Sequence, residues 1–152
     1  MRLVSKFLRY WLPLVIWLIM IFIGSTDLMS AEHTSRIIGP ILRWLDPGMS
    51  PTRIEQVQFV IRKTAHVSEY AILSLLIFRA LVKTTRRARF TGAVLITLLV
   101  SGAFAASDEF HQSFVASRTS SVRDVLIDVT GAILGMTIYG SFLHKTKVPI
   151  KA

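Results

Sequence analysis

The sequence predicts an all-α integral membrane protein, a four-helix bundle with a further helix in its first outer loop. Three observations lead to this fold class. The chain of 152 residues is 52% hydrophobic with a mean hydropathy of +0.54, it contains long apolar stretches, and only 18% of its residues are charged. This composition is too apolar for an ordinary soluble domain. We expect one membrane domain, residues 1–152, with spans at about 10–26, 63–82, 90–107 and 122–143.

The charge of the chain indicates topology and not a nucleic-acid partner. The formal net charge is +9 and the isoelectric point is about 10.7. The cations lie between the apolar stretches, where they act as topology signals. We therefore expect no nucleic acid among its partners. The chain has no cysteine, which excludes disulfides and thiolate chemistry.

The first span, residues 10–26, is a run without charge that is rich in Leu, Ile and Trp. It is long enough to cross about 30 Å of hydrocarbon as a helix. Arg2, Lys6 and Arg9 precede it. Because no small-x-small cleavage site follows and more apolar spans do, we interpret it as an uncleaved anchor.

The stretch between the first two spans is amphipathic. Its apolar residues recur with helical spacing, at Ile37, Ile38, Ile41, Leu42, Trp44 and Leu45. This pattern favours a short helix that lies in the membrane interface. Asp46-Pro47-Gly48 ends that helix, and Ser50-Pro51 offers an N-cap followed by proline at the first helical position. We expect the next helix to start near Pro51 and to continue into the second span.

The third and fourth spans carry small residues suited to close helix packing. In the third span, residues 90–107, they are Gly92, Ser101, Gly102, Ala103, Ala105 and Ala106. In the fourth, from about Val122 to Leu143, the motif Gly131-x-x-x-Gly135 is typical of helices that approach each other closely.

The short connection between the second and third spans decides the predicted orientation. It carries the cations Lys83, Arg86, Arg87 and Arg89 and no acidic residue. Positive residues favour the cytoplasmic side, so both termini are predicted to be cytoplasmic. The start of the second span, the end of the third and the start of the fourth then meet at the outer face.

Polar residues are concentrated at these three span ends. One helical face of the second span carries Lys63, His66 and Tyr70, as their spacing shows. Asp108 and Gln112 likewise share a face at the end of the third span. Ionisable groups at membrane depth are costly unless they are paired or face a polar interior, so their convergence indicates a functional site. The alternative for single residues is structural, with Lys63 reaching the headgroups and His66 packing in the core. The candidate ligand-binding residues are Lys63, His66, Tyr70, Asp108, Glu109, Gln112, Arg118, Asp124 and Asp128.

These residues fall into three ordered motifs. They are K-x-x-H-x-x-x-Y over 63–70, D-E-x-x-Q-x-F over 108–114 followed by Arg118, and D-x-x-x-D-x-x-G-x-x-x-G over 124–135. Together the motifs resemble the VanZ-like family of bacterial membrane proteins. One departure is Asp128, at a position where the family usually has asparagine. The resemblance implies a cell-envelope protein of the bacterial cytoplasmic membrane with a shared polar site, in a family named for a member linked to teicoplanin resistance. It implies no established reaction.

The predicted polar site is compatible with two main functions. One is an envelope protein that binds a lipid headgroup, a lipid-linked envelope precursor or a glycopeptide antibiotic at the outer leaflet. In it, Lys63, Arg118 and Arg123 hold a phosphate, and Trp44 is an interfacial platform. The other is an intramembrane hydrolase or group transferase with His66 as general base, oriented by Asp108 or Glu109. Lys63 and Arg118 would then stabilise developing negative charge.

Two further possibilities rank lower. A metal-dependent enzyme would use His66, Glu69, Asp108 and Asp128, but no H-E-x-x-H or other dense ligand spacing is present. We therefore predict no metal ligands and no cofactor from the sequence. Intramembrane carboxylates also permit a transporter or proton relay, which four spans would form only as a homo-oligomer.

Overall fold

The computed structural model describes residues 2–26, 31–85, 90–115 and 121–145, and over this part all regular secondary structure is α-helix. The helices are α1 (Arg2–Ser25), α2 (Ala31–Leu45), α3 (Pro51–Thr84), α4 (Phe90–Gln112) and α5 (Val122–Lys145). The all-α class is thereby confirmed.

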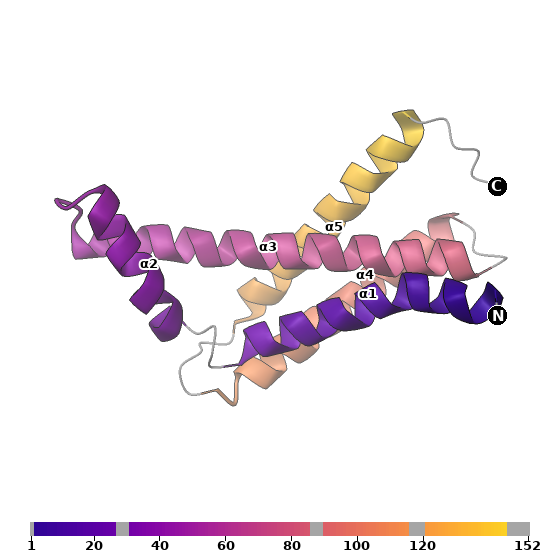
Figure 1. The fold of residues 1–152 in the computed structure, drawn as a ribbon, viewed down its shortest axis with the longest axis horizontal. Helices are drawn as coiled ribbons and strands as arrows, with labels where there is room; N and C mark the ends of the chain where they lie inside the picture. The colour runs from indigo at the N-terminus through magenta and orange to yellow at the C-terminus, as the bar shows by residue number, and fades with distance from the viewer. Residues whose placement is uncertain (1, 27–30, 86–89, 116–120, 146–152) are drawn as a thin grey trace.

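The long helix α3 is the centre of the fold. Its most extensive contact is with α5, α1 also packs on it, and α4 packs on both α3 and α5. In Figure 1, α1 and α4 run opposite to α3, whereas α5 runs in the general direction of α3 and crosses it obliquely. As a result, the ends of α1 and α4 and the start of α5 all lie beside the middle of α3.

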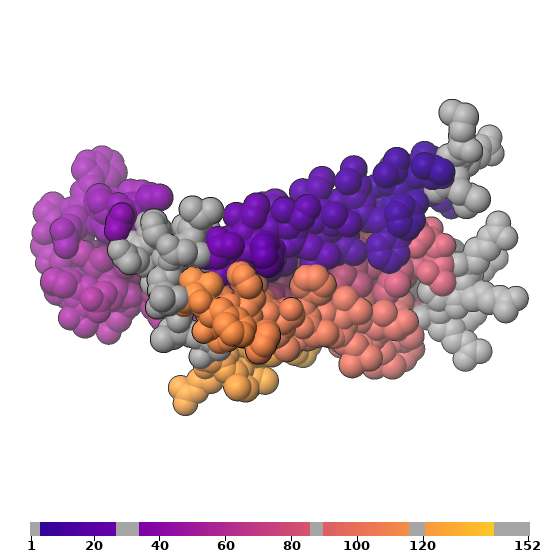
Figure 2. All heavy atoms as spheres, turned by 90° about the horizontal axis from the view of Figure 1, so that it is seen from below, coloured from indigo at the N-terminus to yellow at the C-terminus, as the bar shows by residue number. Residues whose placement is uncertain are grey.

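The start of α3 follows from its sequence. The side chain of Ser50 accepts a hydrogen bond from the backbone N–H of Arg53 at 3.4 Å, and Pro51 takes the first helical position, where no N–H is needed. The helix then continues for 34 residues, which corresponds to about 50 Å at about 1.5 Å per residue. Figure 2 shows the first part of α3, together with α2, projecting past the ends of α1 and α4.

Helix α2 packs on this projecting part of α3 through its polar side. Ser35 Oγ donates a hydrogen bond to Gln58 Oε1 at 2.7 Å. The apolar side of α2 is turned outward, so that Ile37, Ile41 and Trp44 are largely exposed. An outward apolar face is what an interfacial helix needs, and the position of α2 at the membrane surface stays a prediction.

Apolar and polar side chains are distributed as expected for a protein in lipid. Large apolar residues cover the outside of the long helices, with Phe22, Leu99 and Ile138 more than half exposed. Thr97 and Ser101, in contrast, are fully buried in α4. A soluble protein does not expose apolar surface on this scale.

Within the described residues, the helices long and apolar enough to cross a membrane are Val4–Ser25, Pro51–Thr84 and Phe90–Gln112. The fourth predicted span corresponds to α5. Arg123, Asp124 and Asp128 lower the hydropathy of its first half, and its insertion as a fourth spanning helix stays a prediction.

Glycines bring the backbones of α3 and α5 together. A Cβ atom built on Gly131 would lie 3.0 Å from the Cα of Val67 and would overlap its carbonyl oxygen. One built on Gly135 would lie 2.9 Å from the Cα of Ala71. Real side chains are not found at such distances, so the close approach predicted for this glycine motif is confirmed.

Candidate functional site

Polar residues of α3 and α5 pair along the same seam as the glycines. Lys63 Nζ forms an ion pair with Asp124 Oδ1, and one turn further along, His66 Nδ1 lies 3.3 Å from Asp128 Oδ1. The side chains of Lys63 and Asp124 are 25% and 18% exposed, whereas Asp128 is 0% exposed. The seam therefore leads from a partly exposed pair into the interior, where Gly131 follows.

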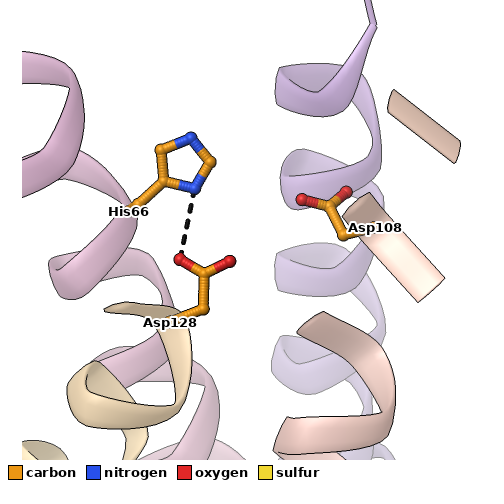
Figure 3. A group of neighbouring side chains, drawn as sticks. All are labelled: His66, Asp108 and Asp128. Atoms are coloured by element: carbon orange, nitrogen blue, oxygen red, sulfur yellow. Dashed lines mark ion pairs between the residues drawn. The ribbon is translucent and has the colours of Figure 1, made fainter. Parts of the chain in front are cut away.

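Helix α4 adds a second buried carboxylate to this region. Asp108 is 9% exposed, and Gln112, one turn later, donates a hydrogen bond from Nε2 to Asp108 Oδ2 at 2.9 Å. One nitrogen of His66 and one oxygen each from Asp108 and Asp128 all lie within 4.8 Å of one another. Figure 3 shows these three side chains approaching one another from separate helices. We call His66, Asp108 and Asp128 the buried triad.

Several polar atoms of the triad and its surroundings have no hydrogen-bond partner among the described residues. They are Nδ1 of His66, both carboxylate oxygens of Asp128 and the hydroxyl of Tyr70. His66 and Asp128 are close enough for an ion pair but do not meet the geometry of a hydrogen bond. Buried polar groups in proteins are nearly always hydrogen-bonded. These atoms therefore need a partner that the described residues do not supply.

A cavity of about 340 Å³ opens beside the triad. Helices α1 and α2 contribute mainly apolar residues to its wall, such as Trp17, Ile21 and Ile38, whereas α3 and α4 contribute Arg62, His66, Glu69 and Asp108. Trp17 is fixed by a hydrogen bond from its Nε1 to the backbone oxygen of Glu69 at 3.0 Å. An apolar wall with a few convergent polar groups is typical of a small-molecule site.

The other sequence-predicted residues of α3 and α5 do not line this cavity. Lys63 and Asp124 hold each other in the pair described above. Tyr70 is fully buried in the apolar core with Leu14, Ile21 and Leu73. Arg123 is exposed on α5, and Arg118 lies outside the described residues.

Glu109 is turned toward the start of α5. Its Oε2 accepts a hydrogen bond from the backbone N–H of Ser121 at 2.8 Å. Ser121 in turn caps α5, because its hydroxyl accepts a hydrogen bond from the backbone N–H of Arg123 at 3.1 Å. Glu109 therefore ties the end of α4 to the start of α5, and it does not line the cavity.

Sequence reasoning missed Arg62 and the contribution of α1. Arg62, His66 and Glu69 are spaced i, i+4, i+7, which places them on one helical face, and this spacing was a signal available in the sequence. No comparable signal marked α1. It is held against α4 by a contact of 3.1 Å between Ser25 Oγ and His111 Nδ1.

Most of the chain matches a known protein family. A protein-family model described as VanZ/LLP1 matches residues 10–143 and therefore covers all three motifs. No curated protein and no solved structure matches the chain. The matched range includes most of the chain, so the resemblance seen in the motifs is confirmed. This helical, membrane-type protein belongs to the VanZ/LLP1 family.

Proposed function

We propose that the protein binds the headgroup of a membrane lipid or of a lipid-linked envelope precursor in the cavity beside His66 and Asp108. The observation that carries this proposal is the two-sided lining of the cavity. Its apolar wall of Trp17, Ile21 and Ile38 faces a polar side with Arg62. Amphipathic molecules match such a lining, because their chains and headgroups need different surroundings.

The position of the cavity supports a lipid ligand. It lies beside the ends of α1 and α4, and the ends of spanning helices meet the headgroup region of a bilayer. Arg62 supplies a cation there. A guanidinium group binds phosphate through two parallel hydrogen bonds, which favours an anionic headgroup.

The size of the cavity favours a headgroup over a whole antibiotic. Ligand cavities commonly measure about 300–1,000 Å³, and this cavity, at about 340 Å³, is at the small end. A multi-ring glycopeptide would place only part of itself inside. Binding of teicoplanin itself, with a contribution to resistance, is therefore the weaker proposal. Competition between teicoplanin and polyprenyl phosphate tests it.

A second function, an intramembrane hydrolase or group transferase, is favoured by the orientation of His66. Its Nδ1 faces the carboxylate of Asp128, which leaves Nε2 to take a proton from a substrate. Buried carboxylates orient general-base histidines through a hydrogen bond from Nδ1, and at 3.3 Å a small rotation of either side chain would complete that bond. The sequence suggested Asp108 or Glu109 for the orienting role, and the contact is made by Asp128. Release of inorganic phosphate from a polyprenyl diphosphate, lost in His66→Ala, would test this function.

Binding can be measured through Trp17, which lies in the cavity wall. A variant with Trp11 and Trp44 replaced by phenylalanine leaves it as the only tryptophan. In detergent, polyprenyl phosphate should change its fluorescence saturably, and Arg62→Gln should weaken binding at least about tenfold. The matched control is Arg53→Gln, an exposed arginine of the same helix outside the cavity.

Two results would contradict the proposal. One is a fluorescence change that never saturates, and the other is an equal loss of affinity in the Arg62 and Arg53 variants. Adding teicoplanin tests the antibiotic alternative, because a glycopeptide that binds in the cavity should compete with polyprenyl phosphate. Competition can be measured only if polyprenyl phosphate binds, so the titration with polyprenyl phosphate is done first.

A further inference from the structure

We infer that the buried triad binds one divalent metal ion. His66 comes from α3, Asp108 from α4 and Asp128 from α5. Residues far apart in the sequence thus present one imidazole nitrogen and two carboxylate oxygens within 4.8 Å of one another. The sequence held no dense ligand spacing because each helix contributes a single ligand.

The burial of the ligands supports this inference. Asp128 is 0% exposed, and both of its carboxylate oxygens lack a hydrogen-bond partner among the described residues. Burying a carboxylate in this state is costly unless a cation compensates it. One of its oxygens is directed toward His66 (Figure 3), at 3.3 Å from Nδ1, so a compensating ion would lie inside the triad.

The charges of the triad give a second, independent reason. A protonated His66 would balance only one of the two carboxylates. In the described part of the chain, no lysine or arginine forms an ion pair with Asp108 or Asp128. A divalent cation with a neutral imidazole would balance both carboxylates.

The donor set indicates which kind of metal fits. Catalytic zinc sites share the pattern of three protein ligands with a position left open, although they usually contain more histidine. A set rich in carboxylates also suits manganese. Donor atoms around such an ion lie about 3–4 Å apart, given bonds of about 2.0–2.2 Å. The present 4.8 Å therefore requires only small side-chain movements. Gln112 already holds Oδ2 of Asp108 through a hydrogen bond, as outer partners of metal ligands do.

The metal would face the cavity of the proposed function, because His66 and Asp108 line that cavity. Its open positions would be available to an anionic group such as phosphate. The inference does not rest on the proposed function, since metal uptake is measured without any lipid. Failure of either proposal therefore leaves the other standing.

The test uses the full chain, purified in detergent and treated with a chelator. Zn²⁺ and Mn²⁺ are titrated separately by calorimetry, with metal content measured by mass spectrometry. We expect one equivalent of at least one of these metals per chain and a higher unfolding temperature in its presence. The variants Asp128→Asn and His66→Gln should each lower the affinity at least about tenfold.

Asp124→Asn is the matched control. It removes a carboxylate one turn earlier on the same helix, where the partner is Lys63 and not the triad. Its metal affinity should equal that of the unchanged protein. Equal losses in the Asp124 and Asp128 variants would overturn the inference, because the metal would then respond only to net charge.

A measurement on the unchanged protein guards against variants that fail to fold. Co²⁺ bound by one nitrogen and two oxygens in a site of low coordination gives a visible absorption spectrum, which added Zn²⁺ should remove by competition. Failure of the unchanged protein to take up Zn²⁺, Mn²⁺ or Co²⁺ would overturn the inference without any variant.

Discussion

His66 and Asp128 face each other across the contact of α3 and α5, with 3.3 Å between Nδ1 and the nearest carboxylate oxygen. Asp128 is fully buried, and His66 is its only ion-pair partner among the described residues. Among the described residues, the buried carboxylate of Asp128 therefore depends on the imidazole of His66 for charge compensation, and Nδ1 of His66 depends on Asp128 for a polar partner.

This dependence should appear in a double-mutant cycle. His66→Ala leaves a buried carboxylate uncompensated and should lower stability strongly, by about 3–5 kcal/mol. The double variant His66→Ala/Asp128→Ala should be more stable than the sum of the single effects predicts, by about 0.5–3 kcal/mol. Reversible unfolding in detergent, monitored by circular dichroism, measures both quantities. Strictly additive losses would show that the two residues act independently.

The glycine contacts lead to a prediction about packing. Gly131→Ala and Gly135→Ala each place a methyl group against the backbone of α3, so each should destabilise the protein by about 1–3 kcal/mol. Gly140 lies further along the same helix with nothing within 4 Å of a Cβ. Gly140→Ala should therefore be neutral or should stabilise the protein by up to about 1 kcal/mol. Similar unfolding temperatures for all three variants would mean that α5 does not press on α3.

The Lys63–Asp124 pair should contribute less than the buried pair. Both side chains retain some exposure, and such pairs contribute about 1 kcal/mol or less. Asp124 also lies in the first turn of α5, where the helix dipole favours an acid. Asp124→Ala should thus lower the unfolding temperature more than Lys63→Ala does. The opposite order would show that the dipole contributes little, and the exposed Arg123→Ala serves as a control.

Topology can be tested because the chain contains no cysteine. A cysteine at Thr52, exposed in the first turn of α3, should react with an impermeant maleimide added outside cells. Thr52 is preferable to Ser50, whose side chain caps the helix. A cysteine at Thr85, exposed after the end of α3, should react only after the membrane is opened. Outside labelling at Thr85 would reverse the predicted orientation.

The helices were largely predictable because their ends carry local signals. Ser50 and Pro51 define the start of α3, and a charged segment follows its end. The predicted third span stopped at residue 107, whereas α4 continues to Gln112. Hydropathy falls at Asp108 and Glu109, but the helix continues because those side chains find polar partners in Gln112 and Ser121.

The candidate site was only partly predictable. The spacing of the motif over 124–135 puts Asp124 and Asp128 on one helical face with the glycines, and the predicted topology brings three polar segments to the outer face. Spacing along one helix does not determine how neighbouring helices are rotated or shifted. The contacts of Gly131 with Val67 determine the register of α5 on α3, and so they also determine that His66 meets Asp128. The direction of Glu109 on α4 is determined separately, by its hydrogen bond with Ser121.

The seam between α3 and α5 also restricts how the length of this protein can change during evolution. One residue inserted between Asp128 and Gly131 would rotate the rest of α5 by about 100°. The carboxylate and the glycines would then face different neighbours, and no single movement of the helix would restore both. Insertions and deletions in related sequences should therefore fall outside residues 128–135 of α5. Within these residues, the carboxylate and the glycines keep their positions relative to each other.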